Sequence, residues 1–418
     1  MRKIAIVGAG QAGLLIAHAL LRKGHQVTVH TDKTPDQLFN SRVWATPFLT
    51  SRACAFEEEL GLSHWDGQQQ FAAGAYLEVC PAPAQRALTV IGQIAKAGKS
   101  IDLRLKYARW LADLERRGGT VVHQPSGVTE LESLSKENDL VLVTAGKGEL
   151  SRLFPRDDSR SAHTQPSRNL VTAIFKGFKR SADQRFPSLR FVMTAGHGEF
   201  FSMPYFDRVR GPADVFLFEA IPGSGLDRFG DVTSAAGMTQ RIREVVHHFA
   251  PWLDETLAHA EVVDETAWLT GAFTPTVRHP VARLPSGNPV MAVGDAVLLN
   301  DPIAGQGLNN ATLMAKAVSD AILEHGDGPF TEDWMRRTFD AYWETEGQFR
   351  THFTNMLLEP PPPHVMQLLG AASQVPTVAA DFIRCFEDPK LFWPWITSPE
   401  QTLARIQRLS QPAQPGGV

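Results

Sequence analysis

The N-terminal segment combines two short strand patterns with one helical pattern. Residues 4–7 form a fully apolar run, which is typical of a strand buried on both faces of a parallel sheet. Apolar residues then recur with helical spacing at Leu14, Ala17 and Leu21, and Gly24 ends that helix. A second strand pattern follows at residues 26–30. This order predicts a Rossmann-like strand–helix–strand unit.

Later segments repeat both kinds of pattern. Apolar runs at residues 139–144 and 290–294 predict two further buried strands. A helix is expected over residues 104–117 and another up to Ala321. Other strand candidates lie at residues 170–175, 190–194, 215–220 and 261–263. The mixture predicts an α/β protein, and its 418 residues exceed the roughly 250–300 that one hydrophobic core usually serves.

A glycine motif directly follows the first predicted strand. It reads Gly8-Ala9-Gly10-Gln11-Ala12-Gly13, the G-x-G-x-x-G pattern of dinucleotide-binding sites. Gly8 allows a tight turn, Gly10 lets a pyrophosphate approach the backbone, and Gly13 lets the helix pack close to the strand. The N–H groups at the start of the helix would bind the anion. The motif therefore predicts dinucleotide binding.

The residue that would bind the nucleotide ribose is less well defined. An acid usually closes the second strand, but this strand ends His30-Thr31-Asp32. Thr31 and Asp32 are therefore the candidates. Asp32 either binds the ribose one position late or is a solvated turn residue.

A second glycine-rich turn follows the strand at residues 290–294. Asp295 comes first, and then residues 301–310 read Asp-Pro-Ile-Ala-Gly-Gln-Gly-Leu-Asn-Asn before a helix. This arrangement resembles the second flavin fingerprint of the aromatic-hydroxylase superfamily. A helix N-terminus at this place would stabilise the negative charge of a reduced flavin. Ala145 and Gly146, after the strand at 139–144, resemble the third nucleotide-contacting element of that superfamily.

Composition and charge exclude several classes of function. Hydrophobic residues make up 43% and charged residues 21% of the chain, and the net charge is −4 without a basic stripe, so neither nucleic acid nor an anionic membrane is an expected partner. The three cysteines do not form a Cys-x-x-Cys pair, and we predict no metal site. No apolar run approaches the roughly 20 residues of a membrane span. We expect a cytoplasmic protein.

These motifs, in this order, resemble the oxygenase component of styrene monooxygenase and of the related indole monooxygenase. Further similar segments are Ser41-Arg42, residues 195–199 and Ser398-Pro399-Glu400. The resemblance implies a two-component system, in which an NADH-dependent flavin reductase supplies FADH2. The oxygenase would react FADH2 with O2 to a C4a-hydroperoxyflavin, which epoxidises a styrene-like or indole-like double bond or oxidises a sulfide.

The resemblance also implies the site residues. Arg42 and Arg104 would contact the flavin; the alternative for Arg104 is a solvated residue at the start of a helix. Pro302, Asn309 and Asn310 would lie at the reactive edge of the flavin as catalytic residues. The predicted cofactor contacts are Gly8, Gly10, Gln11, Ala12, Gly13, Thr31, Asp32, Arg42, Arg104, Ala145, Gly146, Asp295, Pro302, Gly305, Gln306, Gly307, Leu308 and Asn309. Ala45, Pro47, Leu49, Met203 and Pro204 would line the substrate pocket. The first three depart from the pattern of styrene enzymes, so the substrate stays open.

The expected architecture is a Rossmann-like FAD-binding domain with an inserted mixed-sheet substrate domain and C-terminal helices. The FAD-binding domain would comprise residues 1–46, 85–165 and 270–345, and the substrate domain residues 47–84 and 166–269. Residues 346–410 would be helical, and residues 411–418 a disordered tail. A homodimer is compatible with the sequence.

Two alternative functions stay open. One is a single-component, NAD(P)H-dependent aromatic hydroxylase, since some such enzymes lack a second glycine motif for the nicotinamide cofactor. The other is a non-catalytic FAD-binding sensor protein.

Overall fold

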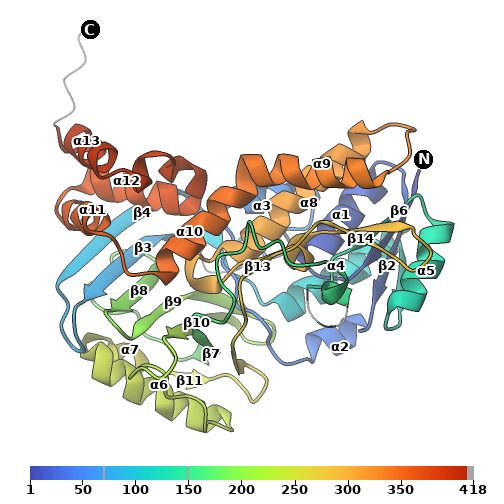
Figure 1. Ribbon diagram of the computed structural model, residues 1–418. Coiled ribbons are helices and arrows are strands. Elements are labelled where there is room, and N and C mark those ends of the chain that lie inside the picture. The colour runs from blue at the N-terminus through green and yellow to red at the C-terminus, as the bar shows by residue number, and fades with distance from the viewer. Residues whose placement is uncertain (69–70, 147, 149, 412–418) are drawn as a thin grey trace.

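The computed structural model describes residues 1–68, 71–146, 148 and 150–411, and two large sheets organise it (Figure 1). The first sheet has six strands in the order β14-β15-β6-β1-β2-β5. Five are parallel, and only β14 at one edge is antiparallel to its neighbour. The strands are β1 (Lys3–Val7), β2 (Gln26–Thr31), β5 (Thr120–His123), β6 (Leu140–Val143), β14 (Val281–Arg283) and β15 (Pro289–Ala292). This is the predicted Rossmann-like sheet.

Helices pack against this sheet and against one another. The residues of α1 from Gln11 to Leu20 are all buried, so neighbouring elements surround this helix on every side. α8 packs along α1 and brings the second glycine turn to the first. The helices of this region are α1 (Gln11–Arg22), α2 (Pro35–Phe39), α3 (Ser51–Glu59), α4 (Leu103–Arg116), α5 (Val128–Glu137), α8 (Gln306–Glu324) and α9 (Glu332–Tyr342).

The second sheet is mixed, as predicted. Its order is β11-β7-β10-β9-β8-β3-β4, with β12 also paired to β7, and only the β3–β8 pair is parallel. The strands are β3 (Phe71–Cys80), β4 (Leu88–Lys99), β7 (Asn169–Lys176), β8 (Leu189–Thr194), β9 (Gly198–Asp207), β10 (Gly211–Ala220), β11 (Glu261–Val262) and β12 (Trp268–Gly271). α6 (Ala235–Phe249) and α7 (Asp254–Leu257) follow β10, and β13 (Thr276–Val277) pairs with β16 (Leu298–Leu299).

One predicted boundary is wrong. We assigned residues 85–165 to the flavin domain, but β4 lies in the mixed sheet, where it forms an antiparallel pair with β3. β4 is the last strand of that sheet, and many of its residues are partly or fully exposed. Its half-polar sequence therefore lacks the apolar run by which we recognised the buried strands.

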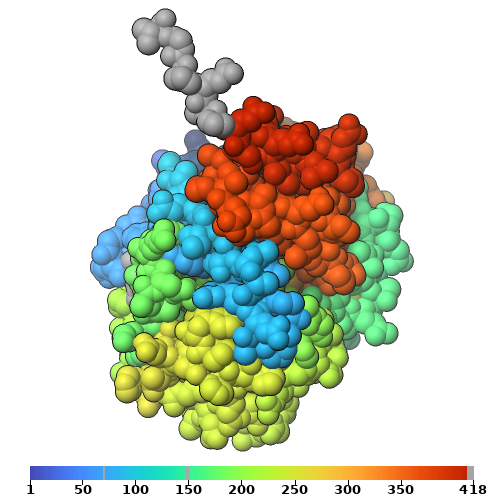
Figure 2. All heavy atoms as spheres, turned by 90° about the vertical axis from the view of Figure 1, so that its left-hand side faces the viewer, coloured from blue at the N-terminus to red at the C-terminus, as the bar shows by residue number. Residues whose placement is uncertain are grey.

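The C-terminal helices form a third layer. They are α10 (Gln348–Leu358), α11 (Pro363–Gln374), α12 (Pro376–Glu387) and α13 (Pro399–Ser410). α11 and α12 pack on β4, and Figure 2 shows this red segment beside the light-blue strands. The predicted tail lies outside the described residues from position 412 onward. Within the described residues, no helix has the length and apolar character needed to cross a membrane.

Candidate functional site

The first glycine turn lies at the carboxyl end of β1, and each glycine has a separate steric environment. Gly8 has a φ of +119°, and a Cβ atom there would lie 2.8 Å from the backbone nitrogen of Ala145. A Cβ atom on Gly13 would lie 2.2 Å from the carbonyl oxygen of Gly8. Next to Gly10, by contrast, a Cβ atom would meet nothing within 4 Å. The chain is therefore closed at Gly8 and Gly13 and open at Gly10, where a pyrophosphate would approach.

The structure brings the separated motifs together. A Cβ atom on Gly294 would lie 3.1 Å from the Cβ of Ala12, and one on Gly146 would lie 2.5 Å from the Cβ of Asp295. Gln11 at the start of α1 donates a 2.8 Å hydrogen bond to Thr312 of α8. The two turns and the loop after β6 therefore meet at one edge of the first sheet.

The second glycine turn is open on the side that a ligand would approach. Gly305 adopts the left-handed conformation, with a φ of 60°, between the 3-10 turn η4 (Pro302–Ala304) and α8. Cβ atoms added at Gly305 or Gly307 would meet nothing within 4 Å. No side chain caps the N-terminus of α8 or that of α1. Two uncapped helix N-termini at one sheet edge suit an anionic dinucleotide.

The polar side chains after this turn bind the protein itself. The Asn309 oxygen accepts hydrogen bonds from the Thr50 backbone and hydroxyl, and its amide donates to the carbonyl oxygens of Phe48 and Gly305. Asn309 therefore has no side-chain hydrogen-bonding capacity left for a flavin ring. We predicted that Asn309 contacts the flavin ring. Its hydrogen bonds instead fix the turn to the segment before α3.

Two neighbouring residues also bind the protein, although the buried amide nitrogen of Asn310 has no partner among the described residues. The Asn310 side-chain oxygen accepts a 2.6 Å hydrogen bond from the Tyr342 hydroxyl. Gln306 accepts a hydrogen bond from the buried Arg350 of α10 and donates one to the Ala304 carbonyl. α10 is thereby linked directly to the second glycine turn. We read Gln306, Asn309 and Asn310 as residues that hold the turn in place, and sequence patterns carried no signal for these long-range partners.

The predicted pocket residues fall in two groups. Leu49 is buried and contacts the cluster that includes Leu308, while Pro47 is half-buried and Ala45 is exposed. Met203 and its buried neighbour Pro204 lie on β9. Ile303 belongs to the same apolar cluster as Met203, so the turn borders on apolar side chains of the mixed sheet.

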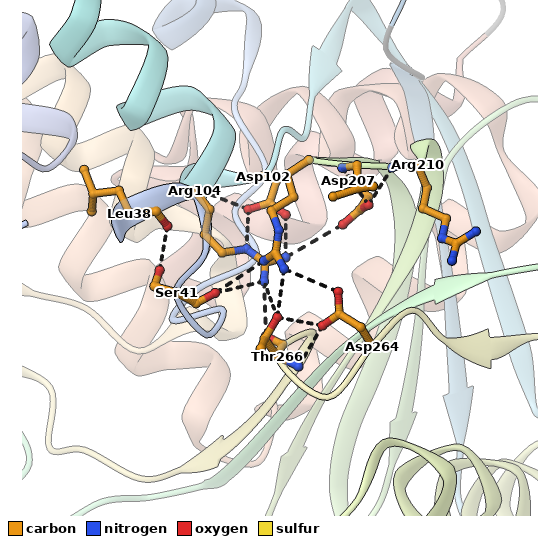
Figure 3. A network of polar contacts seen from close by, with 10 residues as sticks. Leu38, Ser41, Asp102, Arg104, Asp207, Arg210, Asp264 and Thr266 are labelled. Atoms are coloured by element: carbon orange, nitrogen blue, oxygen red, sulfur yellow. Dashed lines mark hydrogen bonds and ion pairs between the residues drawn. The ribbon is translucent and has the colours of Figure 1, made fainter. Parts of the chain in front are cut away.

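Arg104 lies in a buried network at the junction of the two sheets (Figure 3). Its guanidinium pairs with Asp102 through Nε at 2.9 Å and Nη2 at 2.6 Å, and lies 3.7 Å from Asp207. The remaining nitrogen donates to the carbonyl oxygens of Ser41 and Thr266. Burial lowers the pKa of Arg104, but the hydrogen bonds and charge of Asp102 outweigh this effect and raise it. The structure thus gives Arg104 protein partners at the position where we predicted a flavin contact.

The end of β2 presents a residue that the sequence reasoning missed. Asp32 is exposed and forms a 2.7 Å ion pair with Lys33, and Thr31 contacts the Lys33 backbone. The His30 side chain is buried, and neither ring nitrogen has a partner among the described residues. The His30 carbonyl accepts a hydrogen bond from the Gly8 backbone, so this residue adjoins the first turn. The sequence did contain a signal for this: the acidic residue, Asp32, lies one position beyond the end of β2, where the ribose-binding acid is usually found.

Arg42 follows α2 in the chain and contacts the mixed sheet. Its guanidinium donates a 2.7 Å hydrogen bond to the Trp268 carbonyl and stacks over the Trp268 ring. These contacts join the segment after α2 to β12 of the mixed sheet. Its predicted contact with the flavin stays a prediction.

Comparison with known proteins agrees with this geometry. Residues 146–256 match a family described as "Styrene monooxygenase A putative substrate binding domain". The chain is 29% identical over 415 residues to the styrene monooxygenase StyA of Pseudomonas fluorescens, covering 96% of each chain, and equally to that of a Pseudomonas sp.. Over nearly its whole length the chain is therefore similar to styrene monooxygenases. This confirms the resemblance inferred from the glycine turns and makes the protein a flavin-dependent monooxygenase.

Solved structures confirm the fold class. The chain superimposes on a triple mutant of the flavin-dependent brominase Bmp2 with a TM-score of 0.68 and 16% identity, covering 98% of this chain and 99% of that one. A flavoprotein/dehydrogenase from Cytophaga hutchinsonii gives a TM-score of 0.65 and 14% identity, with the same coverage. At such low identity the likeness concerns the fold alone.

Proposed function

We propose that this protein is the oxygenase component of a two-component system that binds FADH2 supplied by an NADH-dependent flavin reductase. It would use O2 to epoxidise styrene-like or indole-like aromatic alkenes, or to oxidise an aryl sulfide. The observation that carries the proposal is the meeting of two open glycine turns, each at an uncapped helix N-terminus, beside an apolar cluster. Reduced flavin and O2 supply the oxygen-transfer chemistry.

The protein's part in this reaction is binding, orientation and exclusion of water. The N-termini of α1 and α8 would hold the anionic parts of the cofactor. The hydrogen bonds of Asn309 and Gln306 fix the second turn, so the cofactor would meet a preformed surface. The apolar side chains beside Ile303 would keep water from the reacting atoms.

Product analysis with styrene, indole and an aryl sulfide tests the proposal. The protein is incubated with NADH, FAD and a flavin reductase, and parallel reactions omit the reductase. We expect an oxygenated product from at least one substrate, and only when the reductase is present. NADH oxidation by the protein alone would favour the single-component hydroxylase instead. No product from any substrate, with the reductase demonstrably active, would reject the assignment.

We further propose that His30 hydrogen-bonds the ribose of the FAD adenosine. Burial lowers the pKa of His30, so its ring is neutral near pH 7 and offers one donor and one acceptor. His30→Phe keeps an aromatic ring but removes both, and the loss of one or two neutral hydrogen bonds should weaken FAD binding about 3- to 10-fold. Asp32→Ala is the matched control and should bind FAD as the wild type does. If a flavin fluorescence titration shows weaker FAD binding in Asp32→Ala than in His30→Phe, Asp32 binds the ribose instead.

A further inference from the structure

Three buried carboxyl groups surround the start of the second glycine turn. Glu199 on β9 and Glu219 on β10 are directly opposite each other in the mixed sheet. Asp301 immediately precedes Pro302 and caps η4 by accepting a 3.1 Å hydrogen bond from the Ile303 backbone. The exposed fractions of Glu199, Glu219 and Asp301 are 7%, 0% and 1%. The three side chains are therefore shielded from solvent directly behind the turn.

The positive charge near this group does not balance three carboxylates. Arg168 forms a 2.8 Å ion pair with Glu199, and it uses another nitrogen to bind the Leu358 carbonyl. Neither oxygen of Glu219 has a hydrogen-bond donor among the described residues. Arg168 and His163 both act to lower the pKa of Asp301. An ionised, unpaired carboxylate at full burial is strongly unfavourable.

Glu219 and Asp301 nevertheless lie close enough for a hydrogen bond between their side chains. Ionised carboxylates only accept hydrogen bonds, so one of the two must carry a proton to donate it. With that proton, the pair carries one negative charge instead of two, and Asp301 keeps an oxygen for the backbone of η4.

We propose that Glu219 and Asp301 share a proton, and that this protonated pair is a positioning device that holds the turn at residues 301–307 in its flavin-binding shape. Removal of the proton places two negative charges in contact at full burial, pushes Asp301 from Glu219 and releases the cap of η4. This inference rests on the proposed function, because it concerns the turn that would hold the flavin.

The electrostatics of the neighbouring groups agree with this geometry. Burial raises the pKa of Glu219 well above its usual range, and the charge of Asp301 raises it further. Burial raises the pKa of Asp301 although its hydrogen bond with Glu219 opposes the change. Burial also raises the pKa of Glu199 to about 7, against the effect of Arg168. All three shifts favour protonation, so the folded state binds more protons than the unfolded state as pH rises from about 4 toward neutrality.

The direction of the pH dependence follows from these shifts. A carboxyl group whose pKa is raised by folding stabilises the protein fully below its unfolded pKa, and that contribution is lost as pH rises through the folded pKa. FAD binding that depends on the protonated pair should therefore weaken as pH rises. One linked proton limits the change to about tenfold per pH unit.

The decisive variant is Glu219→Gln. Its amide donates to Asp301 at every pH and does not titrate, so it mimics the protonated acid. FAD affinity is measured by flavin fluorescence, and FADH2 affinity anaerobically, from about pH 6 to 9. We expect wild-type affinity to fall about tenfold over this range and the affinity of Glu219→Gln to stay nearly constant. In the infrared spectrum, Glu219→Gln should lose a protonated-carboxyl band.

Asp214→Asn is the matched control. Asp214 lies on the same strand, about 16 Å along it from Glu219, and burial raises its pKa to about 8. Asp214→Asn should change the pH dependence of stability but leave that of FAD binding as in the wild type. If Glu219→Gln does not fold, Asp301→Asn provides the same amide donor from the other side and should also give pH-independent binding.

The outcomes separate this inference from the proposed function. Parallel loss of FAD affinity with pH in the wild type and in Glu219→Gln would overturn the inference, even if the reductase-coupled assay gives product. A pH-independent affinity in the wild type would do the same. Absence of FAD and FADH2 binding at any pH would overturn the inference and the proposed function together.

Discussion

Replacement of Gly13 by alanine should both destabilise the protein and weaken FAD binding. The new Cβ would lie 2.2 Å from the Gly8 carbonyl oxygen and 2.6 Å from the Thr144 hydroxyl, and the first of these is backbone that cannot rotate away. Overpacking of this kind costs roughly 1–3 kcal/mol or more. Alanine is a better helix former than glycine, so a loss of stability would come from the collision. The first turn must shift, and with it the N–H groups that we propose bind the cofactor.

The expected size of the binding effect follows from those N–H groups. A hydrogen bond to a charged group contributes about 1.5–3 kcal/mol, so loss of a single one lowers FAD affinity about 10- to 100-fold. Thermal unfolding and a fluorescence titration measure the two effects separately. A Gly13→Ala protein with unchanged stability and affinity would show that the close approach of α1 to β1 is not needed.

Gly10→Ala is the informative control for this experiment. Its Cβ would meet no protein atom within 4 Å, so stability should change by at most about 1 kcal/mol, the usual effect at a helix N-cap. FAD affinity should still fall, since the Cβ occupies the approach of the pyrophosphate. Gly230, where a Cβ also meets nothing within 4 Å, provides a glycine-to-alanine change outside both turns.

The glycine turns could be predicted from the sequence because their requirements are local. The tight turn at Gly8 and the close packing at Gly13 involve residues of one strand–helix unit, so a short motif specifies them. The parallel strands could be predicted for the same reason, because each is marked by its own short apolar run. The strand at residues 190–194 was predicted within one residue at its start, because three consecutive apolar residues at 191–193 mark it.

The side-chain partners at the site could not be predicted in this way. Asn309 binds Thr50 across 259 positions of the chain, and Gln306 binds Arg350 across 44. Periodicity indicates that such residues are buried, but it does not indicate which polar atoms they meet. The motif therefore located the second turn correctly, whereas the structure suggests that its polar residues hold the turn rather than touch the flavin.

The buried partners of Arg104 could not be predicted from the sequence either. Its replacement should cause the second large loss of stability that we expect. In Arg104→Ala, Asp102 and Asp207 would be left at exposed fractions of 0% and 1% without their cation. Breaking a buried ion pair by removing one partner costs about 3–5 kcal/mol. We expect a cooperative unfolding transition at much lower denaturant concentration. Arg104→Lys should restore only part of the loss, because one ammonium group cannot reproduce the two-point contact with Asp102 and the bonds to both carbonyl groups.

Two measurements identify the cause of the stability loss in Arg104→Ala: its pH dependence and the stability of a second variant on α4. Protonation of the two orphaned carboxylates at low pH removes the buried charge, so the difference between wild type and Arg104→Ala should narrow as pH falls. Arg109→Ala removes an exposed guanidinium from an i,i+4 ion pair with the buried Asp113. Asp113 keeps Arg116 and His64 as partners, so stability should change by less than about 1 kcal/mol. If Arg104→Ala instead unfolds like the wild type but loses FAD affinity, the guanidinium acts on the flavin, as the sequence resemblance implied. A loss of stability that becomes smaller at low pH would instead show that Arg104 stabilises the junction between the two sheets. This junction holds the glycine turns and the apolar cluster in one site.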